Sequence, residues 1–235
     1  MAGSGKGERV AAPAIALGPI EVSSRIVDAI AARLKQAIIT GRLAPGTQLS
    51  VPALARSLSV SRSPVREAVL QLVGSGLAVE QPRKGVAVTT VDHDDLVRIH
   101  EIREYLEGSA ARYCAERIAL ADVAALEAIL ARQKKAVSEG DAEHYYRTNA
   151  ELHRLIAGHA GNPRLAEMLA KLEDQMAIAL VRIAASRAHM RDGLREHGEI
   201  VAEIRARAPA KAEAAMRAHI AATLSRVRQQ AETNS

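Results

Sequence analysis

Apolar residues recur at helical spacing along most of this chain. Ile26, Ile30, Leu34 and Ile38 follow one another at intervals of four after Ser23 and Ser24, either of which can cap a helix, and the glycines and proline of TGRLAPGTQL end the pattern. Two short runs, VPALARSLSV and SRSPVREAVLQLVGSG, come next with little between them. Two short helices joined by a tight turn are typical of a helix-turn-helix.

The pattern changes at residue 77. GLAVEQPRKGVAVTTV contains two β-prone runs, 77–80 and 86–91, around a turn with Pro82 and Gly85. This segment predicts a β-hairpin wing behind the helix-turn-helix.

From Asp92, a plausible helix cap, the helical period returns. Leu96, Ile99, Arg103 and Leu106 lie along one stripe, and five further amphipathic segments follow at roughly 120–137, 141–158, 163–187, 190–206 and 209–230. The prediction is a mainly α protein: a flexible tail (1–22), a winged helix-turn-helix of three helices plus the hairpin (23–91), and an antiparallel all-α bundle of about six helices (92–232).

Composition supports this reading. The chain has no Phe, no Trp and four Tyr, which favours helices over a β-sandwich, and its single cysteine, Cys114, cannot form an intrachain disulfide. No apolar run of about 18 residues is present, so we expect a cytoplasmic protein without a membrane segment.

The charge is unevenly distributed. Residues 1–90 carry 11 Lys and Arg against 5 Asp and Glu, whereas residues 91–235 carry 21 against 22. The positive charge therefore belongs to the first domain, as expected if that domain binds nucleic acid.

The start of the third helix is the candidate DNA reader. Arg62, Ser63 and Arg66 fall on its exposed side, Pro64 is tolerated in a first turn, and Ser61 or Ser63 can cap it. A helix N-terminus with two arginines attracts phosphates, and an arginine there can read guanine. The predicted DNA contacts are Ser61, Arg62, Ser63 and Arg66, with Arg83, Lys84 and Gly85 of the wing. The alternative is that Arg62 forms only a surface ion pair with Glu67 or Glu80.

Three histidines, His153, His197 and His219, lie on the apolar stripes of separate helices, and Asn149 precedes His153 by one turn. A single inward histidine is usually a hydrogen-bonded core residue, but three nitrogens and one oxygen suit Zn²⁺ or a neighbouring metal such as Ni²⁺ or Mn²⁺. We expect the other five histidines to be exposed or near helix caps, and assign them no role: His93, His100, His144, His159 and His189.

AIITGRLAPGTQLSVPALARSLSVSRSPVREAVLQLVGSGLAVEQPRKGVAV resembles the winged helix-turn-helix of the GntR regulators. The resemblance implies a homodimer on a palindromic double-stranded operator, with Arg62, Arg66 and Gly85 as DNA contacts. Many members have an arginine where Pro52 stands, which argues against a DNA contact from that position.

NAELHRLIAGHAGNPRL, REHGEI and AEAAMRAHI resemble the ligand-bearing segments of the FadR C-terminal domain type, FCD. The resemblance implies a divalent metal at Asn149, His153, His197 and His219. A neutral amide at Asn149 compensates less charge than a carboxylate, so occupancy is expected to be partial or assisted by an organic-acid effector. Arg103 is the candidate residue for binding the effector's carboxylate. The alternative is that Arg103 only forms an ion pair with Glu107, four residues further on.

The leading interpretation is a ligand-responsive transcriptional regulator, a repressor rather than an enzyme. One alternative keeps DNA binding but makes the bundle a metal-free dimerisation module. The other, a metal-dependent hydrolase, lacks a base: there is no HExxH motif, and Glu196 falls on a different helix face from its neighbour His197.

Overall fold

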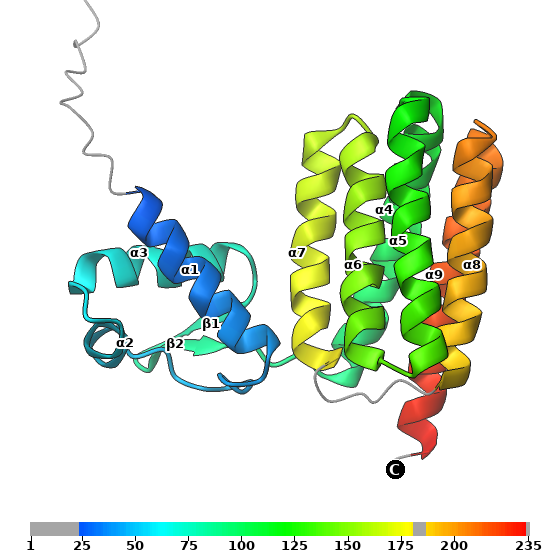
Figure 1. Cartoon of the computed structure of the whole chain (residues 1–235). Coiled ribbons are helices and arrows are strands. Elements are labelled where there is room, and N and C mark those ends of the chain that lie inside the picture. The colour runs from blue at the N-terminus through cyan, green and yellow to red at the C-terminus, as the bar shows by residue number, and fades with distance from the viewer. Residues whose placement is uncertain (1–23, 181–186, 234–235) are drawn as a thin grey trace, which may run out of the picture.

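The computed structural model describes residues 24–180 and 187–233 (Figure 1). Its N-terminal part contains α1 (Ser24–Ile39), α2 (Val51–Leu58), α3 (Arg62–Gly74) and the antiparallel strands β1 (Ala78–Gln81) and β2 (Gly85–Val88). The predicted tail, residues 1–22, and the possible cap Ser23 lie outside the described residues.

One apolar core holds this part together. Val65, Val69 and Leu72 of α3 are buried, as their spacing predicted, against α1 and β1. The prediction for α1 was wrong at its first position, because Ile26 is 44% exposed and Val27 takes the buried place. Steps of four advance about 40° beyond a full turn, so the stripe through Ile30 and Leu34 reaches back to Val27 rather than to Ile26.

The helical part is a bundle of α4 (His93–Arg117), α5 (Leu120–Glu139), α6 (Ala142–His159), α7 (Pro163–Leu180), α8 (Arg187–Arg205) and α9 (Pro209–Thr233). Figure 1 shows α7, α6, α5 and α8 side by side, with α4 and α9 behind them. The Asp92 carboxylate accepts a hydrogen bond from the Asp95 N–H at 2.8 Å and so caps α4, as predicted. None of the described helices is long and apolar enough to cross a membrane.

The two parts meet along α7, the bundle helix next to α1 in Figure 1. Lys35 Nζ of α1 lies 2.6 Å from Asp174 Oδ2 of α7. Ile178, one turn further along, is buried in the core of the N-terminal part. Gln175 packs so closely on Gly76, in the turn between α3 and β1, that a Cβ there would lie 2.2 Å from its amide nitrogen. The helix α7 is therefore shared between the bundle and the winged helix.

Candidate functional site

The N-terminal turn of α3 presents a basic, exposed surface. Arg62, Ser63 and Arg66 are exposed, and among the described residues neither arginine pairs with a carboxylate, so the predicted ion pairs of Arg62 with Glu67 or Glu80 do not form. The predicted cap is wrong as well: Ser61 occupies the N-cap position without a side-chain hydrogen bond, and the Ser63 hydroxyl donates to Glu67 Oε1 at 3.3 Å. Ser63 does not cap the helix because its hydroxyl bonds to the Glu67 carboxylate one turn further on.

The wing lies next to this turn. Arg83 and Lys84 are exposed at its tip, and a turn is closed by the Lys84 N–H donating to the Gln81 carbonyl at 3.0 Å. Gly85 has φ +86°, a left-handed conformation that favours glycine. One surface hollow is bordered by Arg66 of α3, by Lys84 and Gly85 of the wing, and by Pro52 of α2. Three of the predicted DNA contacts, Arg66, Lys84 and Gly85, thus face a common space, whereas the other four, Ser61, Arg62, Ser63 and Arg83, do not line it.

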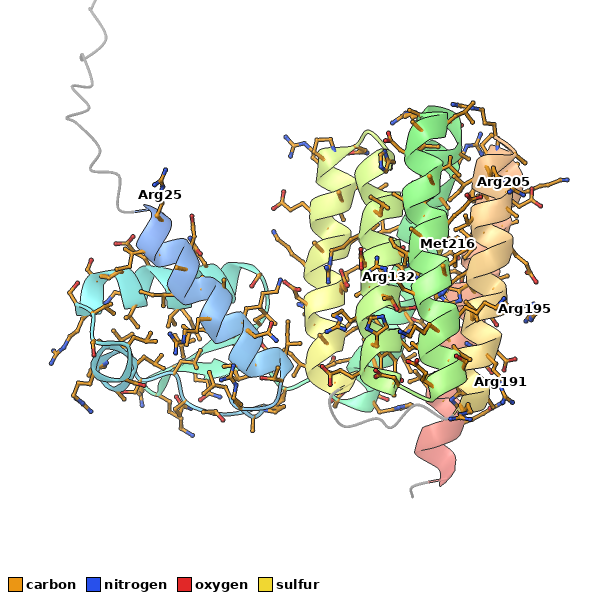
Figure 2. All side chains as sticks on the ribbon, viewed as in Figure 1. Arg25, Arg132, Arg191, Arg195, Arg205 and Met216 are labelled. Carbon is orange, nitrogen blue, oxygen red and sulfur yellow. The ribbon has the colours of Figure 1, made fainter. Side chains whose placement is uncertain are left out.

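The arginines of the bundle are arranged differently. Figure 2 shows Arg191, Arg195 and Arg205 of α8 along the outer edge of the bundle, on the side away from the winged helix. Arg195 lies 2.6 Å from Glu199, and Arg205 lies 3.3 Å from Glu127. These two pairs neutralise part of the positive charge on that edge, whereas Arg62 and Arg66 of α3 form no ion pair among the described residues.

Three histidines from three helices meet inside the bundle. The ligand nitrogens of His153 (α6), His197 (α8) and His219 (α9) lie within 4.8 Å of one another, and all three side chains are buried. His197 Nε2 and His219 Nε2 are 3.2 Å apart. The side chains that the sequence placed on separate apolar stripes therefore form one cluster.

A second layer of polar groups orients the three rings. His153 Nδ1 lies 2.9 Å from Glu107 Oε2, His197 Nδ1 lies 3.0 Å from Gln133 Oε1, and His219 Nδ1 lies 2.7 Å from Glu196 Oε2. Because each partner oxygen accepts, each Nδ1 carries the proton and donates it. The lone pairs of the three Nε2 atoms are then left for the centre of the cluster, an arrangement typical of metal-ligating histidines.

The electrostatics of the cluster favour neutral rings at His197 and His219 beside ionised carboxylates. Burial lowers the pKa of His219 to about 4 although the hydrogen bond to Glu196 opposes the change, and burial also lowers the pKa of His197 well below its usual value. Burial alone would raise the pKa of Glu107, but the neighbouring His153 and Arg103 outweigh it and hold this pKa well below the usual range. Neutral imidazole is the form that binds a metal.

A cavity of about 110 Å³ opens beside the cluster. Asn149, His153 and His219 line it, so three of the four predicted metal ligands border the cavity, while His197 lies behind them, fully buried. Arg226 also lines it, and its guanidinium donates to Glu196. A small anion in this space would be close to both the histidines and a guanidinium.

Arg103, the predicted effector residue, lines the same cavity but is already engaged. Its Nη2 donates to Glu107 Oε1 at 2.8 Å, and its Nη1 lies 2.7 Å from Met176 Sδ. The alternative prediction, an ion pair with Glu107, is therefore present in the structure. The same Glu107 also accepts from His153, so Arg103 is joined to the histidine cluster through one carboxylate.

The prediction that His100 is exposed was wrong. It is 1% exposed, because the face of α4 that carries Leu96 and Arg103 is turned into the bundle, and it lines the cavity. Four further residues around the cluster were not assigned to the metal or effector site from the sequence: Glu107, Gln133, Glu196 and Arg226. The signal for Glu196 was its place beside His197, although it bonds to His219 and not to its neighbour.

Comparison with known proteins identifies both parts. The family of bacterial regulatory proteins described as gntR matches residues 26–88, and the FCD domain matches residues 98–222. The chain is 32% identical over 177 residues to the HTH-type transcriptional regulator McbR of Escherichia coli (strain K12), covering 74% of this chain and 80% of McbR. It is 29% identical over 174 residues to the uncharacterized HTH-type transcriptional regulator YdhC of Bacillus subtilis (strain 168), covering 74% of this chain and 78% of YdhC.

The solved structure of E. coli McbR/YncC has a TM-score of 0.75 at 26% identity, covering 87% of this chain and 98% of that one. The matched relatives are transcriptional regulators and not enzymes. With a winged helix-turn-helix in front and an FCD match over more than half its length, the chain belongs to the GntR family and is a DNA-binding transcriptional regulator.

Proposed function

We propose that this regulator is a ligand-responsive, cytoplasmic repressor whose bundle binds a divalent metal through Asn149, His153, His197 and His219, together with a small organic acid. The observation that carries the proposal is that one ring nitrogen from each of the three histidines lies within 4.8 Å of the others, while every Nδ1 faces an acceptor. Lone pairs that face one another repel, and a shared cation relieves that repulsion.

The donor set fits Zn²⁺ first, with Ni²⁺ or Mn²⁺ as alternatives. Asn149 brings no charge to the site, but the carboxylates of Glu107 and Glu196 stand directly behind two of the ligating rings. They supply negative charge from the second layer and raise the basicity of His153 and His219. Bound metal would offer open positions that a carboxylate can occupy, and Arg103 and Arg226 line the same cavity.

A second candidate keeps DNA binding and makes the bundle a metal-free dimerisation module. The 3.2 Å separation of His197 Nε2 and His219 Nε2 favours it, because a rotated Gln133 amide would donate to His197 Nδ1, and the neutral His197 ring would then carry its proton on Nε2 and donate it to His219. In this case the cluster is a satisfied polar core and not a metal site.

For DNA, we propose that a homodimer places two copies of α3 in successive major grooves of a palindromic operator. Arg62 and Arg66 are its base and phosphate readers, Ser61 and Ser63 lie on the same turn, and the wing residues Arg83, Lys84 and Gly85 reach the flanking backbone. Neither arginine forms an ion pair among the described residues, which supports this assignment.

The shared helix α7 offers a route from ligand to DNA. Met176 lines the cavity and contacts Arg103, while Ile178, two residues on, is part of the core of the winged helix. A ligand that displaces Met176 would shift α7 and the DNA-reading part packed on it. A coupling free energy of about 1–3 kcal/mol is enough for such regulation.

The metal is tested on untagged protein by elemental analysis and thermal unfolding with added Zn²⁺. We expect bound metal and a melting temperature that rises with Zn²⁺ in the wild type and not in His153→Ala. His144→Ala is the matched control, since His144 lies on the same helix but pairs with Arg147 outside the cluster. A wild type that takes up no metal would support the dimerisation module instead.

A further inference from the structure

Leu70 is an exposed apolar side chain on the face of α3 that carries Arg66. It follows Arg66 by four residues and Ser63 by seven, so all three lie on one side of the helix. Leu70 is 50% exposed, whereas its neighbour Val69, which faces the core, is 2% exposed. The packing of α3 therefore does not account for a leucine at this position.

Leu70 also lines the surface hollow that Arg66 and the wing border. Pro52 of α2 and Val86 of β2 add apolar surface to this hollow, and Lys84 brings a positive charge from the wing. A duplex that contacts both Arg66 and Lys84 covers the hollow between them, and with it Leu70. The exposed leucine is thus continuous with the candidate DNA-reading surface.

The chemistry of Leu70 restricts the part of DNA that it can recognise. An apolar side chain forms no hydrogen bond with phosphates or with the donors and acceptors of base edges. The apolar group that the major groove displays is the C5-methyl of thymine. Four residues of helix span about 6 Å, and neighbouring base pairs are about 3.4 Å apart, so Leu70 lies within about two base pairs of the position that Arg66 reads.

We propose that Leu70 is a specificity-determining residue, which packs on the methyl group of a thymine one or two base pairs from the guanine read by Arg66. Pro52 and Val86 complete the apolar surface around this methyl group. The inference rests on the proposed function, which places α3 in the major groove. It adds a base to the operator that charge and hydrogen bonding alone would not select.

Selection of binding sites from a pool of random-sequence duplexes tests this assignment with the full-length protein. Sites selected by the wild type should share a guanine that Arg66→Ala no longer requires, and a thymine next to it or one base pair further on. Leu70→Ala should select the same guanine but accept any base at the thymine position. Val79→Ala is the matched control, because Val79 is 45% exposed on β1 and is not among the residues that line the hollow.

Uracil in place of that thymine isolates the methyl group, because the two bases differ only there. In one half-site of the selected duplex, this replacement should weaken wild-type binding by about three- to fivefold in fluorescence anisotropy, as expected for one buried methyl group. Binding of Leu70→Ala should not respond to the replacement. Leu70→Met, which keeps an apolar side chain of similar size, should retain most of the wild-type response, and thermal unfolding establishes that each variant is folded.

Three results would overturn the inference. The wild type could bind uracil and thymine equally well at every selected thymine, or Leu70→Ala could respond to uracil as strongly as the wild type does. A change in the oligomeric state of Leu70→Ala in analytical ultracentrifugation would mean that Leu70 contacts a second copy of the chain instead. Failure of the proposed function is distinct, since Arg66→Ala would then select the same sites as the wild type.

Discussion

Lys35 of α1 and Asp174 of α7 form an ion pair across the boundary between the winged helix and the bundle, with Nζ 2.6 Å from Oδ2. Met176, two residues after Asp174, lines the cavity beside the histidine cluster, and Ile178 is buried in the winged-helix core. The last turns of α7 therefore contact both the candidate sensor and the DNA-reading part.

Asp174→Asn should weaken the effect of ligand on DNA binding while leaving the fold intact. The lysine side chain is 42% exposed, so the pair contributes at most about 1 kcal/mol to stability. We expect the ratio of operator affinities with and without zinc and acid to shrink several-fold in gel-shift titrations, with a melting temperature within a few degrees of the wild type. Asp95→Asn, which removes the exposed pair with Arg98, is the control, and an equal loss of coupling in both variants would contradict the role of α7.

Arg66→Ala should weaken selective operator binding. A bidentate contact to guanine is worth about 1–3 kcal/mol of discrimination, so affinity for the operator should fall by roughly five- to 150-fold. Arg132→Ala on the bundle surface, where Arg132 pairs with Glu151, should have no effect. The measurement is fluorescence anisotropy on operator and scrambled duplexes, and unchanged discrimination would remove α3 from the recognition role.

Replacing the wing pair, Arg83 and Lys84, by alanine should act differently. Both side chains are exposed at the hairpin tip and are expected to meet phosphates, so affinity should fall for operator and scrambled DNA alike. The slope of log affinity against log salt should become less steep by about one for each phosphate that the variant no longer neutralises. A weakening confined to the operator would instead show that the wing reads bases.

The helices were predictable because each has an apolar stripe that pairs with a neighbour. The boundary of α1 shows the limit of such patterns: Ile26 and Val27 are both apolar, and only the direction from which α3 packs decides which of them is buried. The contact of α7 with the winged helix was not predictable, because Lys35 and Asp174 are 139 positions apart and neither is unusual on its own helix.

The histidine cluster was predictable because a polar residue on the apolar stripe of a helix is buried and therefore requires a polar partner. Its supporting groups were not, since the burial of Gln133 and Glu196 depends on which helices close over them. His100 did carry a signal, because it follows Leu96 by four residues and precedes Arg103 by three and so shares their buried stripe.

Glu107→Gln should reduce zinc affinity without removing a ligand. The carboxylate holds the His153 ring through Nδ1, and removal of such a second-layer partner typically costs about 10- to 100-fold in metal affinity. Glu104→Gln, on the same helix but paired with Arg217 away from the cluster, should bind zinc as the wild type does. Competition with a chromophoric chelator measures the zinc affinity of each variant. Equal zinc affinities in Glu107→Gln and Glu104→Gln would mean that Glu107 does not support the metal site and serves only as the partner of Arg103.

The metal-free protein should lose stability as the pH falls below about 6.5. His100 and His219 have folded pKa values of about 4 against a usual value of 6.5, so between these limits the unfolded chain binds protons that the folded chain does not. Each such histidine lowers the free energy of unfolding by about 1.4 kcal/mol per pH unit across that window. Glu107, with its lowered pKa, adds to the destabilisation only below about 4.5, its usual value.

Urea denaturation of chelator-treated protein at pH 7.0, 6.0 and 5.0 therefore measures the contribution of the histidines to the pH dependence of stability separately from that of the carboxylates. The pH dependence should be weaker in His100→Leu, which removes one of the titrating rings, and unchanged in His93→Leu, whose ring is exposed. Added zinc should steepen the pH dependence, because protons then compete with the metal for the ligating nitrogens as well. A free energy of unfolding that stays constant from pH 7 to pH 5 would mean that the folded and unfolded chains take up the same number of protons, so that the buried rings titrate at their usual pKa and the lowering by burial is wrong.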